Sequence, residues 1–249
     1  MKVIDTHAHL NFDRYDKDRD TVINTAFAND VVNIINIGID AKTSLESIEL
    51  AKKYAKIYAT AGWHPHDATT FDKKELKKLL IHEKIVAVGE IGLDYFRNLS
   101  PKNIQKKVFR EQVEIAMEHD LPIVLHDRDA HKDVMEILTE LAPKKLVFHC
   151  YSGDYTMSQK IIEMGWHISF TGVVTFDRAK YYSIIKDLPD DKFFVETDAP
   201  FLTPKPHRGK RNRPEYVKHI IREIAEIRMK TPNEIAEITT RNAKKFFGI

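Results

Sequence analysis

The chain of 249 residues contains a single cysteine, Cys150, so it can form no intrachain disulfide. This usage fits a reducing compartment. The sequence has no apolar run of the roughly 18 to 20 residues that cross a bilayer. An acidic residue stands at position 5 and no long apolar segment follows it, unlike in a secretory signal peptide. We therefore expect a soluble cytoplasmic protein with no membrane contact.

The chain also has no large excess of charge of one sign, because it contains 39 basic and 37 acidic residues and its net charge is +2. A globally basic nucleic-acid binder is not indicated, so any anion site must be local. No Gly-rich phosphate loop follows an apolar run, and no G-x-S-x-G motif marks a nucleophilic serine. The composition, with 43% hydrophobic and 31% charged residues, is ordinary for a globular protein with a buried core.

Short apolar runs alternate with amphipathic segments along the chain. Most runs are rich in β-branched or aromatic residues and have the length of strands buried on both faces. The eight predicted strands are Val3–His9, Val31–Gly38, Ile57–Gly62, Ile85–Glu90, Ile123–His126, Leu146–His149, Trp166–Phe170 and Phe193–Thr197.

The amphipathic segments predict helices, the first of which follows the second strand. Ser100 is expected to cap the longest helix, with Pro101 in its first turn. Thr231 begins a capping box with proline at the first helical position. The predicted helices are Ser44–Lys53, Lys73–His82, 100–119, Asp129–Leu141, Asp154–Met164, Arg178–Lys186, Pro214–Arg228 and a closing helix from Thr231.

This alternation predicts an α/β fold with a parallel sheet and helical crossovers. A (β/α)8 TIM barrel typically needs about 250 residues. We therefore expect residues 1–249 to form one such barrel as a single domain. A doubly wound open sheet is the alternative, and the missing Gly-rich loop argues against it.

Six residues with nitrogen or oxygen ligand atoms stand at the predicted strand ends, where barrels of this type carry their active sites. A His-x-His pair puts two imidazoles on one strand face. It is weak evidence alone, because 12 histidines give roughly 0.6 such pairs by chance and His64-Pro65-His66 is a second one. The full set suits Zn²⁺, Mn²⁺ or, less well, Mg²⁺. It comprises His7, His9, Glu90, His126, His149 and Asp198.

Six ligands exceed what one tetrahedral ion usually takes. Two divalent ions about 3.5 to 4 Å apart would use them, with a bridging carboxylate. We expect Glu90 to be the bridge, because its strand lies on the opposite arc of the barrel from the strand of His7 and His9.

Six motifs resemble those of the TatD-type metal-dependent deoxyribonucleases, which belong to the amidohydrolase-like barrels. They are DTHAHL at 5–10, GWHPH at 62–66, GEIGLDY at 89–95, LHDRDA at 125–130, FHCYSG at 148–153 and ETDAPFLTPKPHRGKRN at 196–212. The resemblance implies a two-metal site built from the same six residues. Two departures, Ala8 in place of a common Cys and Arg213-Pro214 in place of Glu-Pro, touch no expected ligand.

Other polar residues near the strand ends have two interpretations each. Asp5 and Glu196 share strand parity with ligands, so they either hydrogen-bond to them or play no part. His64 and His66 either stabilise a loop or contact substrate, and Arg128 either contacts substrate or starts a helix. The basic run 205–213, which includes His207, Arg208 and Arg211, is either a solvated surface or a phosphate site, since loops after strands 7 and 8 often bind phosphate. Cys150 is expected to face outward and serve packing.

The expected reaction is hydrolysis of a phosphodiester by a water that two metal ions activate, with Asp198 orienting the water and accepting its proton. The resemblance implies DNA as the substrate, with exonuclease action favoured. One alternative is a D-aminoacyl-tRNA deacylase or another ester or amide hydrolase. The other is a non-catalytic metal-containing barrel that binds nucleic acid. No obligate protein partner is inferred.

Overall fold

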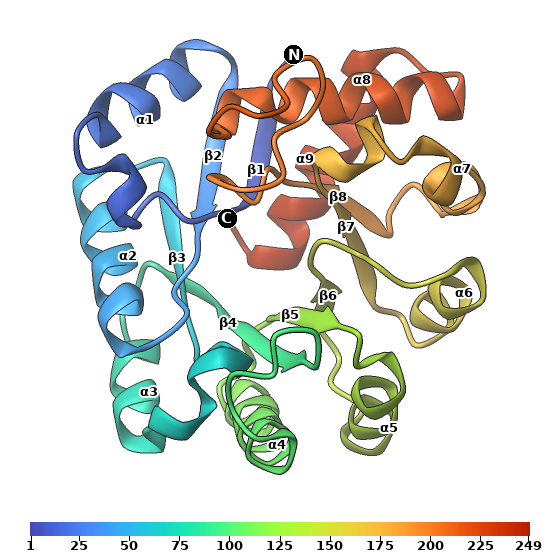
Figure 1. Cartoon of the computed structure of the whole chain (residues 1–249). Helices are drawn as coiled ribbons and strands as arrows, with labels where there is room; N and C mark the ends of the chain where they lie inside the picture. Colours follow the sequence, from blue (N-terminus) through green and yellow to red (C-terminus); the bar gives the residue numbers. More distant parts are fainter.

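The computed structural model describes all 249 residues, and its centre is one sheet of eight parallel strands in the order β1 to β8. The helices surround this sheet (Figure 1). An isolated bridge links Ala8, the last residue of β1, to Ala199 in the segment that follows β8, so the sheet is nearly closed into a barrel. The strands are β1 (Val3–Ala8), β2 (Val31–Asn36), β3 (Ile57–Ala61), β4 (Ile85–Asp94), β5 (Ile123–Arg128), β6 (Leu146–Phe148), β7 (His167–Phe170) and β8 (Phe193–Val195).

The predicted (β/α)8 barrel is confirmed, and the doubly wound alternative is wrong, because every strand pairs with its sequence neighbours. The α-helices are α1 (Arg19–Ala28), α2 (Ala41–Lys53), α3 (Lys73–Leu80), α4 (Lys102–Glu118), α5 (His131–Leu141), α6 (Tyr155–Glu163), α7 (Arg178–Asp187), α8 (Val217–Arg228) and α9 (Pro232–Phe247). Four 3-10 helices lie in the loops: η1 (Asp13–Tyr15), η2 (Pro65–Thr70), η3 (Gly172–Thr175) and η4 (Pro214–Tyr216). None of the helices is long and apolar enough to cross a membrane.

Helix α1 was not expected from the sequence. It buries only Val22, Ile23 and Ala26, so it lacks the extended i, i+3, i+4 repeat that marks an amphipathic helix. The predicted cap of α4 is also wrong. Pro101 occupies the N-cap position, and the Ser100 hydroxyl donates instead to the carbonyl of His66 at 2.8 Å.

The end of the barrel where the strands begin is filled with apolar side chains. Eleven buried residues form one cluster there, and they include Ile4 of β1, Val86 of β4 and Phe194 of β8. Phe246 and Phe247 from the end of α9 belong to the same cluster, so this helix closes the barrel. Its capping box is present, with Glu234 N donating to Thr231 Oγ1 at 3.2 Å.

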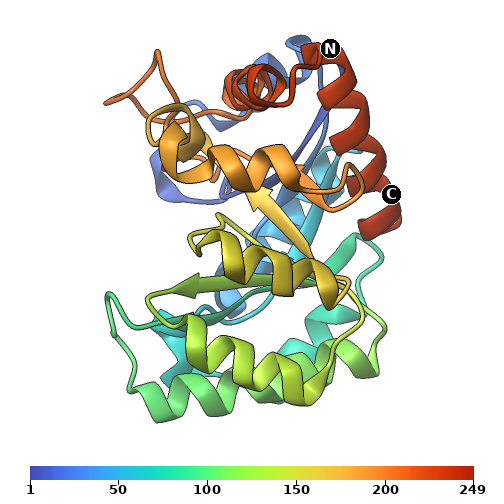
Figure 2. The same ribbon diagram turned by 90° about the vertical axis from the view of Figure 1, so that its right-hand side faces the viewer.

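The other end of the barrel, toward which the strands point, carries the long loops. Figure 2 shows the segments that follow β4 and β8 projecting from this end. We call it the rim. Polar side chains at the rim therefore stand apart from the apolar, helix-covered end.

Candidate metal centre

All six expected ligands lie together at the rim. His7 belongs to β1, Glu90 to β4 and His126 to β5, whereas His9, His149 and Asp198 follow β1, β6 and β8. Five of them are buried, and His126 is partly buried. The strand ends thus bring side chains from positions 7 to 198 into one polar cluster.

Four atoms form what we call the first donor group: His7 Nε2, His9 Nε2, Asp198 Oδ1 and Glu90 Oε2. The two nitrogen atoms are 3.2 Å apart. Glu90 Oε2 lies 3.4 Å from His7 Nε2 and 3.7 Å from His9 Nε2, and Asp198 Oδ1 lies 3.7 Å and 3.4 Å from the same atoms. Ligands of a tetrahedral zinc ion are about 3.3 Å apart. The first donor group has the spacing of donors around one cation.

The second donor group consists of Glu90 Oε1 with His126 and His149. Glu90 Oε1 lies 2.7 Å from His126 Nδ1 and 3.6 Å from His149 Nε2. Glu90 therefore faces a different pair of histidines with each of its oxygen atoms. This is the geometry that a carboxylate needs to bridge two cations.

The charges at the centre are set by burial and by close neighbours. Burial raises the pKa of Glu90, but His149, His126 and His7 outweigh it and hold the pKa well below its usual range. Burial lowers the pKa of His149 and His126, yet neighbouring carboxylates reverse this and raise the values to about 10 and about 9. The cluster is thus rich in anionic carboxylates, and divalent cations can replace the protons that the histidines carry.

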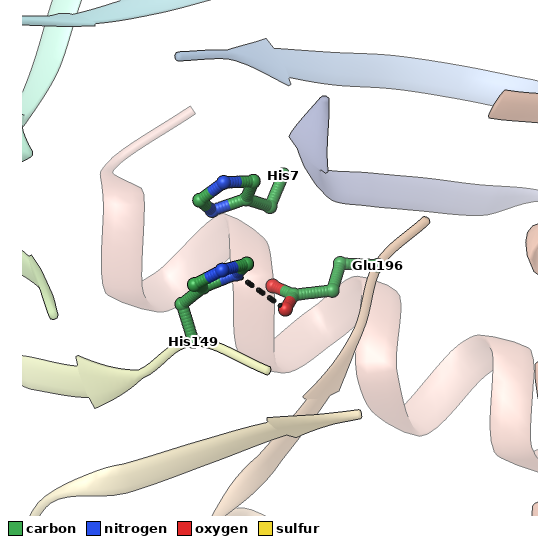
Figure 3. Close-up of side chains that lie close together, drawn as sticks. All are labelled: His7, His149 and Glu196. Atoms are coloured by element: carbon green, nitrogen blue, oxygen red, sulfur yellow. Dashed lines mark hydrogen bonds and ion pairs between the residues drawn. The ribbon is translucent and has the colours of Figure 1, made fainter. Parts of the chain in front are cut away.

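Contacts around the ligands fix the imidazole rings. Glu196 Oε1 accepts from His149 Nδ1 at 2.7 Å and from the backbone N of Cys150 at 2.7 Å. Figure 3 shows the hydrogen bond between His149 and Glu196, with the His7 ring facing the His149 ring. The centroids of these two rings are 3.6 Å apart. His9 in turn stacks on Phe12 at 4.6 Å. A carboxylate and ring stacking therefore orient these histidines toward the centre.

Asp5 accepts hydrogen bonds from backbone N–H groups and a threonine hydroxyl, and not from the imidazole ring of a ligand. Its carboxylate accepts from Thr197 Oγ1 at 2.6 Å, from Thr197 N at 2.9 Å and from His7 N at 3.3 Å. Burial raises the pKa of Asp5 to about 8. Its hydrogen bonds tie β1 to the segment that precedes Asp198, which positions ligands from both ends of the chain.

Asp94 is a member of the cluster that sequence reasoning missed. Its Oδ2 lies 2.9 Å from His66 Nε2 and 3.1 Å from His126 Nε2. His64 Nε2 lies 3.7 Å from Glu90 Oε1, so His64 is inside the polar centre rather than at its edge. His64, Asp94 and His126 together could hold a cation. The sequence did contain a sign of this, because Glu90 and Asp94 share strand parity along β4.

The close contact of β4 with β5 depends on Gly92. This residue has φ of 146°, and a Cβ atom there would lie 1.9 Å from the carbonyl oxygen of His126. Only glycine fits both the backbone conformation and the space. Gly92 thus allows Glu90 and His126 to meet.

Two arginines of the basic loop at the rim, Arg208 and Arg211, differ in exposure and in ion pairing. Arg208 is exposed, donates to the carbonyl of Thr203 at 3.1 Å and lies over the ring of Phe176. Arg211 forms an ion pair with Asp18 at 2.5 Å, so its charge is already matched. Their positions make Arg208 available to a ligand and leave Arg211 holding the loop against the barrel.

His207, Arg128 and Cys150 occupy three further positions at the rim. The ring of His207 stacks on Tyr216 at 4.1 Å. Arg128 is exposed at the end of β5. The thiol of Cys150 does not face the helices as a continuing strand would direct it, because φ is 43° there and Sγ lies 3.4 Å from Thr171 Oγ1.

Comparison with known proteins gives matches over nearly the whole chain. The family model described as TatD related DNase matches residues 4–248. A Bacillus subtilis (strain 168) protein named as the metal-dependent hydrolase YabD is 46% identical over 99% of both chains. The Salmonella typhimurium protein named 3'-5' ssDNA/RNA exonuclease TatD is 33% identical over 99% of both chains. The crystal structure of YJJV, a TatD homologue from Escherichia coli K12, aligns with a TM-score of 0.93 at 30% identity and covers 99% of this chain and 98% of that one.

Proposed function

This chain belongs to the TatD family and is a metal-dependent hydrolase, and from that premise we propose that it cleaves phosphodiester bonds of DNA with two divalent ions. The observation that carries the proposal is the position of Glu90. Its Oε2 lies 3.4 Å from His7 Nε2, and its Oε1 lies 3.6 Å from His149 Nε2. One carboxylate thus belongs to both donor groups, as a bridge between two ions requires.

The six residues have distinct places in this proposal. His7, His9 and Asp198 would hold one ion, His126 and His149 would hold the other, and Glu90 would contribute an oxygen atom to each. Four imidazoles favour Zn²⁺ or Mn²⁺ on grounds of affinity, and Mg²⁺ is the third candidate. Glu196 supports the second donor group by fixing the His149 ring.

The bound ions would lower the pKa of the attacking water and neutralise charge on the phosphoryl oxygens. Asp198 orients the attacking water and accepts its proton, since it is the most exposed of the five buried ligand residues at 9%. Arg208 and Arg128 present exposed guanidinium groups at the same rim and neutralise phosphates further along the strand. His64 contacts the substrate from within the centre, and His207 and Arg211 shape the basic loop.

The test is hydrolysis of a DNA oligonucleotide by protein that has been stripped with a chelator and reloaded with Zn²⁺, Mn²⁺ or Mg²⁺. We expect no cleavage by stripped protein and restored cleavage with at least one metal. An aminoacyl-tRNA, assayed in parallel, tests the ester-hydrolase alternative. Turnover of the aminoacyl ester without cleavage of any phosphodiester would overturn the proposal.

A further inference from the structure

Three arginines at the rim lie over exposed or partly exposed phenylalanine rings. The distances from the guanidinium carbon to the ring centroid are 5.1, 3.9 and 3.9 Å. Phe96 is 58% exposed and Phe201 is 38% exposed. We call these the rim pairs: Arg14 with Phe201, Arg128 with Phe96, and Arg208 with Phe176.

All three rim pairs lie at the end of the barrel that carries the metal centre. Phe96 follows β4, Phe176 follows β7, and Phe201 follows β8. The loops after β4 and β8 project beyond the strands at this end (Figure 2). Large exposed aromatic rings contribute little to folding, so their grouping around one opening indicates a binding surface.

The pair of Arg14 and Phe201 is continuous with the metal centre. The Phe201 ring lies 6.2 Å from the ring of His9 and 6.2 Å from that of Phe12, between centroids. Phe12 stacks directly on His9. A flat group that contacts Phe201 or Phe12 would therefore lie beside a phosphate bound at the donor groups.

An arginine over an aromatic ring can bind two chemical groups at once. The guanidinium edge donates to phosphate oxygen atoms, while its plane and the ring offer faces on which a base can stack. The contact with the ring also restricts the arginine side chain before a ligand arrives, which lowers the entropic cost of binding. Bases of a duplex already stack on one another, so this chemistry selects single strands.

We propose that the three rim pairs hold a single-stranded nucleic acid by its bases, and that Phe201 with Phe12 receives the base beside the bond to be cleaved. This inference rests on the proposed phosphodiesterase function. The opposite end of the barrel supplies control positions, because its cation–ring contacts lie away from the metal centre, and they include Arg228 over Phe193 at 5.2 Å. Lys56 lies over Phe27 at 5.2 Å and Lys84 over Tyr58 at 4.8 Å.

The experiment compares Phe201→Leu, Phe96→Leu and the control Phe27→Leu in the metal-loaded enzyme. Each variant acts on a single-stranded oligonucleotide and on one with tetrahydrofuran abasic sites, which has the same phosphates and no bases at those sites. We expect Phe201→Leu to lower kcat/KM on the base-bearing strand about tenfold, the scale of one lost stacking contact. The abasic strand should be cleaved more slowly by the unmodified enzyme and show little further loss in the variant.

Equal loss on both strands, or no loss on either, would overturn the inference while leaving the hydrolase intact. Cleavage of duplex DNA as fast as single strands by the unmodified enzyme would do the same. If no phosphodiester is cleaved at all, the proposed function fails. Fluorescence anisotropy then decides the inference: a preference for the base-bearing strand that disappears in Phe201→Leu supports it, and equal binding of both strands refutes it.

Discussion

Replacement of Glu90 by Gln tests the core of the proposed centre. The amide has nearly the same shape as the carboxylate, so packing around this buried residue should change little. It keeps one oxygen atom, however, and places an NH₂ group against one of the two histidine pairs. One donor group loses its ligand outright, and the other loses the negative charge.

The size of the effect follows from the position of Glu90 between two groups. Loss of a partner that supports a metal ligand typically lowers metal affinity or activity about 10- to 100-fold. Because Glu90 Oε1 and Oε2 face separate histidine pairs, we expect the two losses to multiply to roughly 10²- to 10⁴-fold in turnover. His126→Gln affects the second donor group alone and should cost less.

The assay combines elemental analysis after dialysis with turnover on an oligonucleotide. Glu136→Gln, on the surface of α5, is the control for loss of one glutamate charge, since the Glu136 side chain is 62% exposed. Glu90→Gln should retain fewer than two ions and show the large loss of turnover. If it kept two ions and near-normal turnover, the assignment of Glu90 as a bridge would be wrong.

Three smaller predictions follow from other residues. Glu196→Gln should weaken binding of one ion about 10- to 100-fold, since His149 loses its charged partner, and metal titration should show the other ion unaffected. Gly92→Ala should lower the free energy of unfolding by roughly 2–5 kcal/mol, since its Cβ would clash with the His126 carbonyl. Chemical unfolding measures this, and the control Gly165→Ala, with φ of 82° and open space around it, should lose less stability. Burial lowers the pKa of His167 to about 4 from its ordinary 6.5, so the neutral form is favoured in the folded protein and stability should fall as pH drops from 6.5 to 4. The loss should be at most about 3 kcal/mol, and urea unfolding of His167→Gln across this range should show a smaller pH dependence.

The positions of the strands could be predicted because buried parallel strands are short apolar runs with clear beginnings. Seven predicted first residues match the structure, and the eighth, Trp166, precedes the observed start at His167 by one residue. The ends were less predictable: β1, β2, β3, β6 and β8 end one or two residues before the predicted residue, whereas β4 and β5 continue past it. β4 was expected to end at Glu90, yet its pairing with β5 continues to Asp94 opposite Arg128. That extension places Asp94 beside His126, and hydrophobicity alone could not reveal it.

The rim aromatics were missed for a different physical reason. From sequence alone, a phenylalanine is expected to lie in the core, since burial of its ring is favourable. Phe148 and Phe170 satisfy this expectation, and each is only 1% exposed. Phe96 and Phe201 do not, and nothing in their immediate sequence distinguishes them. Their exposure results from loops that the barrel holds away from its core.

One end of the barrel holds the apolar cluster that stabilises the fold, and the other end, the rim, holds the donor groups. Phe246 and Phe247 of α9 close the apolar end, so a substrate can reach the donor groups only from the rim. The ligands approach one another through backbone features such as the contact of Gly92 with β5 and the hydrogen bonds of Asp5. Changes at those positions should therefore damage fold and metal binding together. The rings of the rim pairs are only partly buried and supply no ligand atom, so changes there should alter the choice of substrate and leave the metal centre assembled.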